Sequence, residues 1–244
     1  NAMAHSGTLL AVLIYFRKDV AKAVSGGFEL IHMRQGTANA APHSENARLA
    51  LLILASLPIV IIIAGLFTQM PQAIQMSLRS LWVVIASTAF FAVLLWWADR
   101  QPESVHKLPD MTLKQAGLIG AAQAVAAIIP GTSRSGITMT IARMMGFSRP
   151  EAARFSMLIG APVLAISGAY AFYRLANADA ATLSLTLQEG LMVAALSAIS
   201  GYISIAFLMR LLETMSFLPF VLYRLALAVI LLLASPLGAG LILA

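Results

Sequence analysis

The 244-residue chain contains no cysteine and few charged residues. The missing cysteines exclude a disulfide framework and metal sites built on thiolates. Charged residues make up 11% of the chain, against about 25% in soluble domains, whereas 60% of the residues are hydrophobic. This balance excludes a soluble globular domain and predicts a polytopic membrane protein. Since no polar block is long enough for a separate globule, we expect one membrane domain.

The formal net charge of +6 resides mostly in the segments between the apolar runs. In a membrane protein, such a surplus favours contact with anionic lipid headgroups or with an anionic substrate. We therefore expect membrane lipids and an anionic ligand as partners, and no nucleic acid. A homo-oligomer is compatible with the sequence.

Long apolar runs predict helices that cross the membrane, each of which needs about 20 residues. Five segments come close to that length: 49–67 (interrupted by Pro58), 81–98, 155–175, 187–212 and 217–234. These segments predict an all-α fold. Residues 17–48 and 68–79 are predicted to be polar connections. The first apolar run, residues 2–16, is too short to span, so we expect that the natural chain begins further upstream.

Residues 112–146 do not have the pattern of an ordinary span. An apolar run rich in glycine and alanine ends at Pro130-Gly131, and a second short segment follows at 135–145. Proline and glycine together break a helix, and non-helical backbone at membrane depth is tolerated only inside protein or a wet cavity. We therefore predict a re-entrant helical hairpin over 112–146, with its broken tip at 130–135.

The basic residues predict the orientation of the connections. If residues 17–48 face the cytoplasm, the sides alternate so that the connection at 99–114 also faces it, and both are rich in basic residues. The hairpin then enters from the cytoplasmic side and returns there. Three arginines follow on its return: Arg143, Arg149 and Arg154. This distribution agrees with the positive-inside rule.

The predicted tip concentrates polar side chains in an otherwise apolar region. Residues 130–138 have the sequence PGTSRSGIT, with one guanidinium, four hydroxyls and two glycines. An arginine at membrane depth is costly and therefore indicates a functional site. Its fork binds phosphate oxygens bidentately, and glycines let backbone N–H groups approach a ligand. The combination suits a phosphate-bearing ligand.

Residues 130–138 resemble the Pro-Gly-x-Ser-Arg-Ser-x-x-Thr signature of undecaprenyl pyrophosphate phosphatases of the bacitracin-resistance type. The resemblance extends to residues 5–13 (HSGTLLAVL), 145–149 (MGFSR), 155–158 (FSML) and 217–224 (FLPFVLYR). It implies a bundle of two inverted repeats, each with a re-entrant hairpin, in the bacterial inner membrane. It also implies hydrolysis of a polyprenyl pyrophosphate to the monophosphate, which recycles the lipid carrier for cell-envelope synthesis. The active site is expected to open to the outer side.

The resemblance also implies how the chain divides. Residues 1–111 would hold the remainder of the first repeat, and residues 112–244 the second repeat, with the hairpin at 112–146 and three transmembrane helices. The family's first hairpin carries a (Glu or Gln)-x-x-x-Glu motif that is not found here. The expected divalent cation, Mg²⁺ or Ca²⁺, would therefore have its ligands upstream of residue 1 and none in this chain. By itself, the chain is expected to be a poor catalyst.

Roles at the tip follow from the resemblance and from the chemistry of the residues. Arg134 is predicted to be catalytic by stabilising charge in phosphoryl transfer; the alternative is an arginine that holds the hairpin through backbone carbonyls. Ser133 is predicted to act as a nucleophile or as a phosphate ligand, and no base stands beside it in the sequence. The predicted phosphate-binding residues are Gly131, Thr132, Ser135, Gly136, Thr138, Arg224 and Gln123. The alternatives are capping for Ser135 and Thr138, inter-helix bonding for Gln123, and a charge that reaches the membrane interface for Arg224. The two glycines are expected to serve backbone geometry and close approach.

Two other functions are open at this point. Broken helices, inverted repeats and a midplane arginine are also the parts of a transporter. A transporter or flippase for a lipid phosphate or another anion is therefore the main alternative. A lipid phosphatase with histidine nucleophiles is the other, and the sequence speaks against it because no histidine lies near Arg134.

Overall fold

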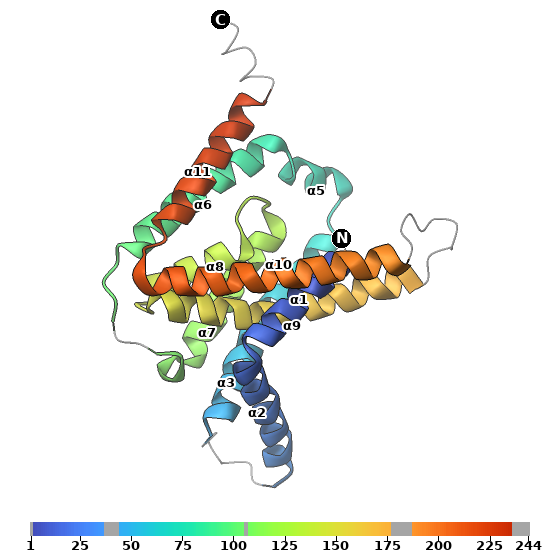
Figure 1. Cartoon of the computed structure of the whole chain (residues 1–244), viewed down its shortest axis with the longest axis vertical. Coiled ribbons are helices and arrows are strands. Elements are labelled where there is room, and N and C mark those ends of the chain that lie inside the picture. Colours follow the sequence, from blue (N-terminus) through green and yellow to red (C-terminus); the bar gives the residue numbers. More distant parts are fainter. Residues whose placement is uncertain (1, 37–43, 105–106, 177–186, 236–244) are drawn as a thin grey trace, which may run out of the picture. The chain divides into compact units, whose positions relative to one another are not determined.

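A computed structural model describes residues 2–36, 44–104, 107–176 and 187–235. All elements in these ranges are helices, which confirms the all-α class (Figure 1). The α-helices are α1 (Ala2–Tyr15), α2 (Arg17–Gly36), α3 (Glu45–Ser56), α4 (Pro58–Thr68), α5 (Gln72–Leu78), α6 (Leu81–Asp99), α7 (Leu113–Ile128), α8 (Arg134–Met144), α9 (Arg149–Ala176), α10 (Leu187–Thr214) and α11 (Leu218–Leu233). A short 3-10 helix covers Leu108–Asp110.

Three helical stretches are long and apolar enough to cross a membrane: Glu45–Thr68 (α3 with α4), Leu81–Asp99 and Glu189–Thr214. They coincide with three of the five predicted spans. Of the other two, one lies within α9, and one is α11, whose 16 residues are fewer than the roughly 20 of a spanning helix. The protein is therefore a membrane protein with several apolar helices.

The chain folds into two compact units, which interleave along the sequence. The first comprises residues 1–51 and 157–211, and the second comprises residues 52–156 and 212–244. Their boundaries do not fall at residue 111, where the resemblance divides the chain, and the division into inverted repeats stays a prediction. The second unit contains the whole predicted hairpin.

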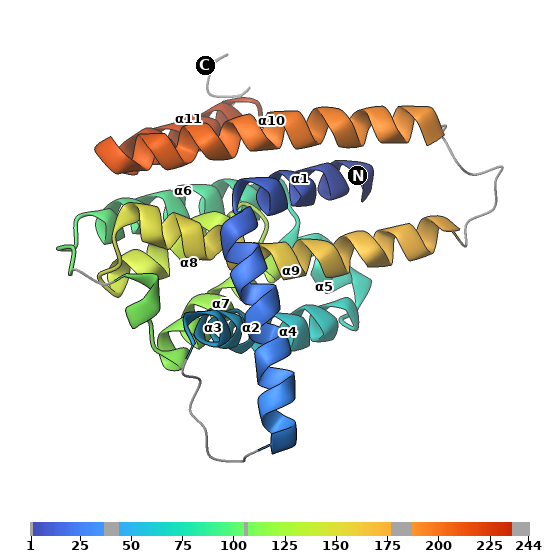
Figure 2. The ribbon, with the colours of Figure 1, turned by 60° about the horizontal axis from the view of Figure 1, so that its bottom comes forward.

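In the first unit, α1 packs closely along α10 (Figure 2). The contact depends on Gly7, where an added Cβ would overlap the Ala194 carbonyl and lie 2.7 Å from the Ser197 side chain. Small residues let helix backbones approach in this way in membrane proteins. Further along the same pair of helices, the rings of Tyr15 and Tyr202 meet edge to face, with centroids 5.7 Å apart.

Two predicted connections are helical. Residues 17–36 form α2. Asp19 lies in its first turn, where the helix dipole stabilises a carboxylate. Residues 72–78, within the predicted loop at 68–79, form α5. The prediction of a loop throughout 68–79 was wrong, because polarity excludes a helix buried in the bilayer but not one at its surface. Residues 17–48 were predicted only to be a connection, which a helix does not contradict.

The predicted hairpin is confirmed as two helices joined by a broken tip. α7 begins with a capping box: the Thr112 hydroxyl accepts the Gln115 N–H at 3.2 Å, and the Gln115 side chain accepts the Thr112 N–H at 2.8 Å. The helix ends before Pro130, where Ile129 is extended (φ −107°, ψ 105°), as residues before proline usually are. Gly131 then reverses the chain with a φ of 85°. In the second unit, α7 packs on α4 and α8, and α6 packs on α8 and α11.

Gly120 is where α7 approaches α3 most closely, because an added Cβ would overlap the backbone of Ser56. Gly120→Ala should therefore destabilise the protein by about 1–3 kcal/mol, the usual cost of overpacking. The thermal unfolding midpoint in detergent measures the loss. Gly117→Ala is the matched control, since its Cβ would lie 3.8 Å from the nearest atom, the Ala55 carbonyl oxygen. Equal losses in both variants would contradict the assignment of the tight contact to Gly120.

Candidate functional site

Ser133 has the most unusual backbone conformation of the tip. With φ of 66° and ψ of 112°, it is the one described residue other than glycine with a positive φ. Such a conformation costs about 1–3 kcal/mol and tends to occur at functional sites. Ser133 Oγ caps α8 by accepting the Gly136 N–H at 3.2 Å, and the side chain is exposed. The hydroxyl proton of Ser133 therefore remains accessible to a ligand.

Arg134 and Ser135 form the first turn of α8, directly after this cap. Both are partly exposed. The Ser135 hydroxyl and N–H have no hydrogen-bond partner among the described residues. Unpaired N–H groups at a helix N-terminus favour an anion, and the helix dipole adds to the attraction. The partly exposed Arg134 side chain, the hydroxyls and the helix terminus together suit the oxygens of a phosphate.

Arg224 reaches the tip from α11. Its Nη2 donates to the carbonyls of Gly131 at 2.6 Å and Thr132 at 3.0 Å. Its Nη1 lies against α8, because an added Cβ on Gly136 would be only 2.9 Å away. Arg224 therefore holds the hairpin through backbone carbonyls, which the sequence suggested as the alternative role of Arg134. A contact between phosphate and the remaining N–H groups of Arg224 stays a prediction.

Two of the predicted ligand hydroxyls are buried inside the hairpin. Thr132 Oγ1 donates to the Ile129 carbonyl at 2.8 Å. Thr138 Oγ1 lies 3.0 Å from two carbonyl oxygens of the first α8 turn and 2.6 Å from Ser156 Oγ on α9. Both threonines are at most 1% exposed. In this structure they brace the tip, and their predicted contact with phosphate would require these hydrogen bonds to break.

Two hydroxyls of α6 also hold the tip, and sequence reasoning missed them. Ser87 Oγ donates to the Pro130 carbonyl at 2.5 Å, and Thr88 Oγ1 donates to the Gly131 carbonyl at 3.4 Å. An added Cβ on Gly131 would overlap Ser87 Oγ, so this position needs glycine for its close approach as well as for its positive φ. The available signal was the pair of adjacent hydroxyls in an apolar span, because such groups bond between membrane helices.

Gln123 is buried in α7, and neither of its amide atoms is hydrogen-bonded to a described residue. The inter-helix bond that the sequence offered as one alternative is therefore not formed in the described part of the chain. A buried unpaired polar group costs about 1–3 kcal/mol, so a polar partner is expected here. The predicted role of Gln123 in phosphate binding stays untested.

The described residues contain no group of three or more His, Asp or Glu side chains that could hold a metal ion. The tip itself offers hydroxyls and cationic nitrogens, which are poor ligands for Mg²⁺ or Ca²⁺ compared with carboxylates. The divalent cation thus stays a prediction, with ligands that these residues do not supply.

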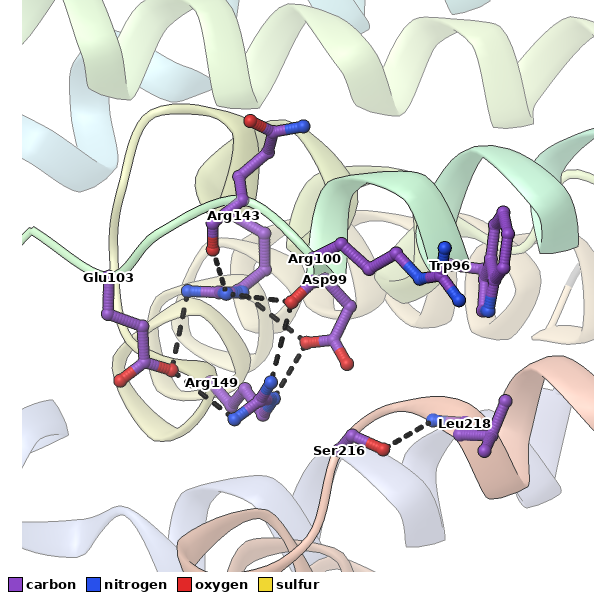
Figure 3. Close-up of a pocket in the computed structure, with 9 residues that line it drawn as sticks. Trp96, Asp99, Arg100, Glu103, Arg143, Arg149, Ser216 and Leu218 are labelled. Atoms are coloured by element: carbon purple, nitrogen blue, oxygen red, sulfur yellow. Dashed lines mark hydrogen bonds and ion pairs between the residues drawn. The ribbon is translucent and has the colours of Figure 1, made fainter.

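A second polar cluster joins the ends of α6 and α8 to the starts of α9 and α11 (Figure 3). Arg143 of α8 is fully buried and donates to the carbonyls of Asp99, Gln101 and Phe147 at 2.7–3.1 Å. Its Nε lies 3.5 Å from the Asp99 carboxylate, an ion pair without a hydrogen bond. Arg149 Nε donates to the same carboxylate at 2.7 Å. Sequence reasoning counted Arg143 among the topology charges and missed that it is a core residue.

This cluster lines a cavity of about 460 Å³. Arg100 lies over the Trp96 ring, 3.6 Å from its centroid, and Glu103 pairs with both Arg143 and Arg149 at 3.4–3.5 Å. Figure 3 shows Asp99, Glu103, Arg143 and Arg149 turned toward one another, whereas Arg100 points toward Trp96. Since Arg143 donates to backbone carbonyls at the helix ends and both arginines form ion pairs with Asp99 and Glu103, the cluster has the character of a junction between helices.

Comparison with known proteins identifies the family. The family described as "Bacitracin resistance protein BacA" matches residues 1–230. The chain belongs to this family. Its relatives include proteins named "Undecaprenyl-diphosphatase" from Hyphomonas neptunium (53% identical over 98% of this chain and 84% of the relative) and Maricaulis maris (43% identical over 95% and 82%). A third, from Teredinibacter turnerae, is 42% identical over 96% of this chain and 83% of the relative. The resemblance drawn from residues 130–138 is therefore confirmed.

In this BacA family protein, the predicted site residues separate into two groups. Ser133, Arg134 and Ser135 are consecutive and accessible at the first turn of α8. The others that the structure brings to the tip hold its backbone or allow close approach: Gly131, Thr132, Gly136, Thr138 and Arg224. Gln123 forms no hydrogen bond to either group.

Proposed function

We propose that this protein hydrolyses undecaprenyl diphosphate to undecaprenyl phosphate and inorganic phosphate. The names of its BacA family relatives support the substrate. The observation that carries the proposal is the turn at 133–135, where a strained serine, a partly exposed arginine and a helix N-terminus coincide. Hydrolysis returns the lipid carrier to its monophosphate form for another round of envelope synthesis.

The residues of the tip have different roles in the proposed reaction. The oxygen of water forms a bond to the terminal phosphorus, the anhydride P–O bond breaks, and undecaprenyl phosphate leaves. Arg134 and the N–H groups of the first α8 turn neutralise the phosphate oxygens as charge develops on them. Ser133 acts as a phosphate ligand rather than as a nucleophile, because an attacking serine needs a base. Its Oγ bonds only to the Gly136 N–H among the described residues.

A divalent cation, Mg²⁺ or Ca²⁺, completes the proposed site. It would supply positive charge to the diphosphate, beyond what the Arg134 guanidinium provides. Its ligands would come from outside the described residues, since these contain no suitable group of His, Asp and Glu side chains.

The proposed location is the bacterial inner membrane, with several passes and the site open to the outer side. The basic residues of α2, Arg17, Lys18 and Lys22, support a cytoplasmic position for that helix under the positive-inside rule. Labelling of single cysteines in intact cells tests this orientation without background, because the chain has no cysteine of its own.

The test of the proposed function is phosphate release from undecaprenyl diphosphate in detergent. The protein is assayed in three forms: with Mg²⁺, with Ca²⁺ and with a chelator. We expect release that the chelator abolishes and that added Mg²⁺ or Ca²⁺ restores. If no form releases phosphate and the protein instead moves a lipid phosphate across vesicle membranes, the function is transport.

A further inference from the structure

We infer that Asp99 is a positioning residue for the phosphate site, although it lies about eleven residues along α6 from the hydroxyls that hold the tip. The inference rests on the proposed function of the tip. The Asp99 carboxylate fixes the start of α11 relative to α6, and both helices hold the tip further along their length. Asp99 would therefore set the position of the phosphate donors without touching the substrate.

The first link is at the end of α6. Asp99 Oδ2 accepts the N–H of Phe217 at 2.9 Å, and Phe217 is the N-cap of α11. That N–H precedes the helix and would otherwise lack a partner. A carboxylate at this end is also favoured by the helix dipole. Phe217 is 1% exposed and Asp99 is 8% exposed, so water cannot readily replace the bond.

The second link is at the tip. Two helical turns after Phe217, Arg224 donates through Nη2 to the carbonyls of Gly131 and Thr132 at 2.6 and 3.0 Å. On the other side, Ser87 of α6 donates to the Pro130 carbonyl at 2.5 Å. These three carbonyls belong to consecutive residues immediately before Ser133.

The hydrogen bonds and the two helices form a closed circuit, in which α6 and α11 are joined to each other at Asp99 and are both joined to the tip. It runs from Asp99 to Phe217, along α11 to Arg224, through the tip to Ser87, and back along α6 to Asp99. The helical sides measure about 10 Å along α11 and about 18 Å along α6 at 1.5 Å per residue. Helices packed side by side behave as rigid elements, so a change where they are joined is transmitted along them. Opening the circuit at Asp99 should let α11 shift and loosen the tip.

The arginines around Asp99 hold its carboxylate in place for this role. Arg149 binds Oδ1 at 2.7 Å and Arg143 lies 3.5 Å from the same oxygen, which leaves Oδ2 directed at Phe217. Glu103 pairs with the same two arginines but forms no described hydrogen bond to α11. Glu103 is therefore a matched control: it is a carboxylate of the same cluster outside the circuit.

The experiment compares Asp99→Ala, Asp99→Asn and Glu103→Gln by hydrogen–deuterium exchange and by phosphate release. In Asp99→Ala, peptides covering 129–137 should exchange faster by about tenfold or more, the factor expected for loss of one hydrogen bond to a charged group. In the same variant, kcat should fall by about 10- to 100-fold, as for a small misplacement of reacting groups, with KM changed less. Asp99→Asn retains an oxygen for the Phe217 N–H and should fall between Asp99→Ala and wild type. Glu103→Gln should resemble wild type in both measurements.

A double substitution separates positioning from general stability. If Asp99 acts through Arg224, the loss of kcat in Asp99→Ala with Arg224→Gln should be clearly smaller than the product of the two single losses. Multiplying losses would overturn the inference, as would tip exchange in Asp99→Ala equal to that in Glu103→Gln. If tip exchange follows Asp99 but no form releases phosphate, the link between Asp99 and the tip stands and the proposed function fails.

Discussion

Replacing Arg134 with alanine is expected to lower kcat for phosphate release from undecaprenyl diphosphate by about 10³-fold or more, as for other arginines in phosphoryl transfer. The side chain is partly exposed in the first turn of α8, where its fork can bind two phosphate oxygens at once. Arg134→Lys keeps a positive charge but loses the fork, so its rate should lie between those of alanine and wild type. Phosphate release over a range of lipid concentrations gives kcat and KM separately.

Arg79→Ala is the control for the loss of a positive charge. Arg79 is exposed at the end of α5, and its replacement should leave both constants unchanged. A loss in Arg134→Ala confined to KM would assign Arg134 to substrate binding alone. Wild-type kcat and KM in Arg134→Ala would contradict any role of the tip in the reaction.

Replacing Arg143 with methionine should lower the free energy of unfolding by about 3–5 kcal/mol, the usual cost of breaking a buried ion pair. Methionine occupies a similar volume but donates no hydrogen bond. The carbonyls of Asp99, Gln101 and Phe147 would each lose a donor, and the Asp99 carboxylate would lose one of its two cations. The shift of the thermal unfolding midpoint in detergent, measured at fixed lipid and salt, reports the loss.

An exposed ion pair supplies the comparison for Arg143. Lys22 lies 3.6 Å from Glu45, and the two side chains are 49% and 76% exposed. Lys22→Gln should therefore cost only about 0–1 kcal/mol. If Arg143→Met destabilises no more than Lys22→Gln, the buried cluster is not a main support of the second unit.

Much of the hairpin could be predicted from local sequence because its causes are local. Pro130 removes a backbone donor and forces the residue before it out of the helix, while Gly131 adopts a positive φ. Thr112 and Gln115 form their capping box within one turn. The helices at 17–36 and 72–78 were missed since polarity alone does not separate a surface helix from a loop.

The contacts that position the candidate site could not be predicted from local sequence. Arg143 and Asp99 are separated by 44 residues, and Asp99 and Phe217 by 118. No pattern along the chain records which helix ends meet. For the same reason, the sequence could not tell that Arg224 holds the tip while Arg134 is partly exposed in the first turn of α8.

From the sequence alone we could predict an all-α membrane protein and the position at which the hairpin breaks. Hydropathy, proline and glycine affect the backbone over a few residues, so their effects can be predicted from the linear sequence. Which hydroxyls of the tip are accessible became visible once the helices were placed in three dimensions. Thr132 and Thr138 are buried and form hydrogen bonds within the hairpin, whereas Ser133 is exposed and Ser135 is partly exposed. A side chain faces a ligand or the core according to how whole helices pack, and that packing depends on contacts between residues far apart in the chain.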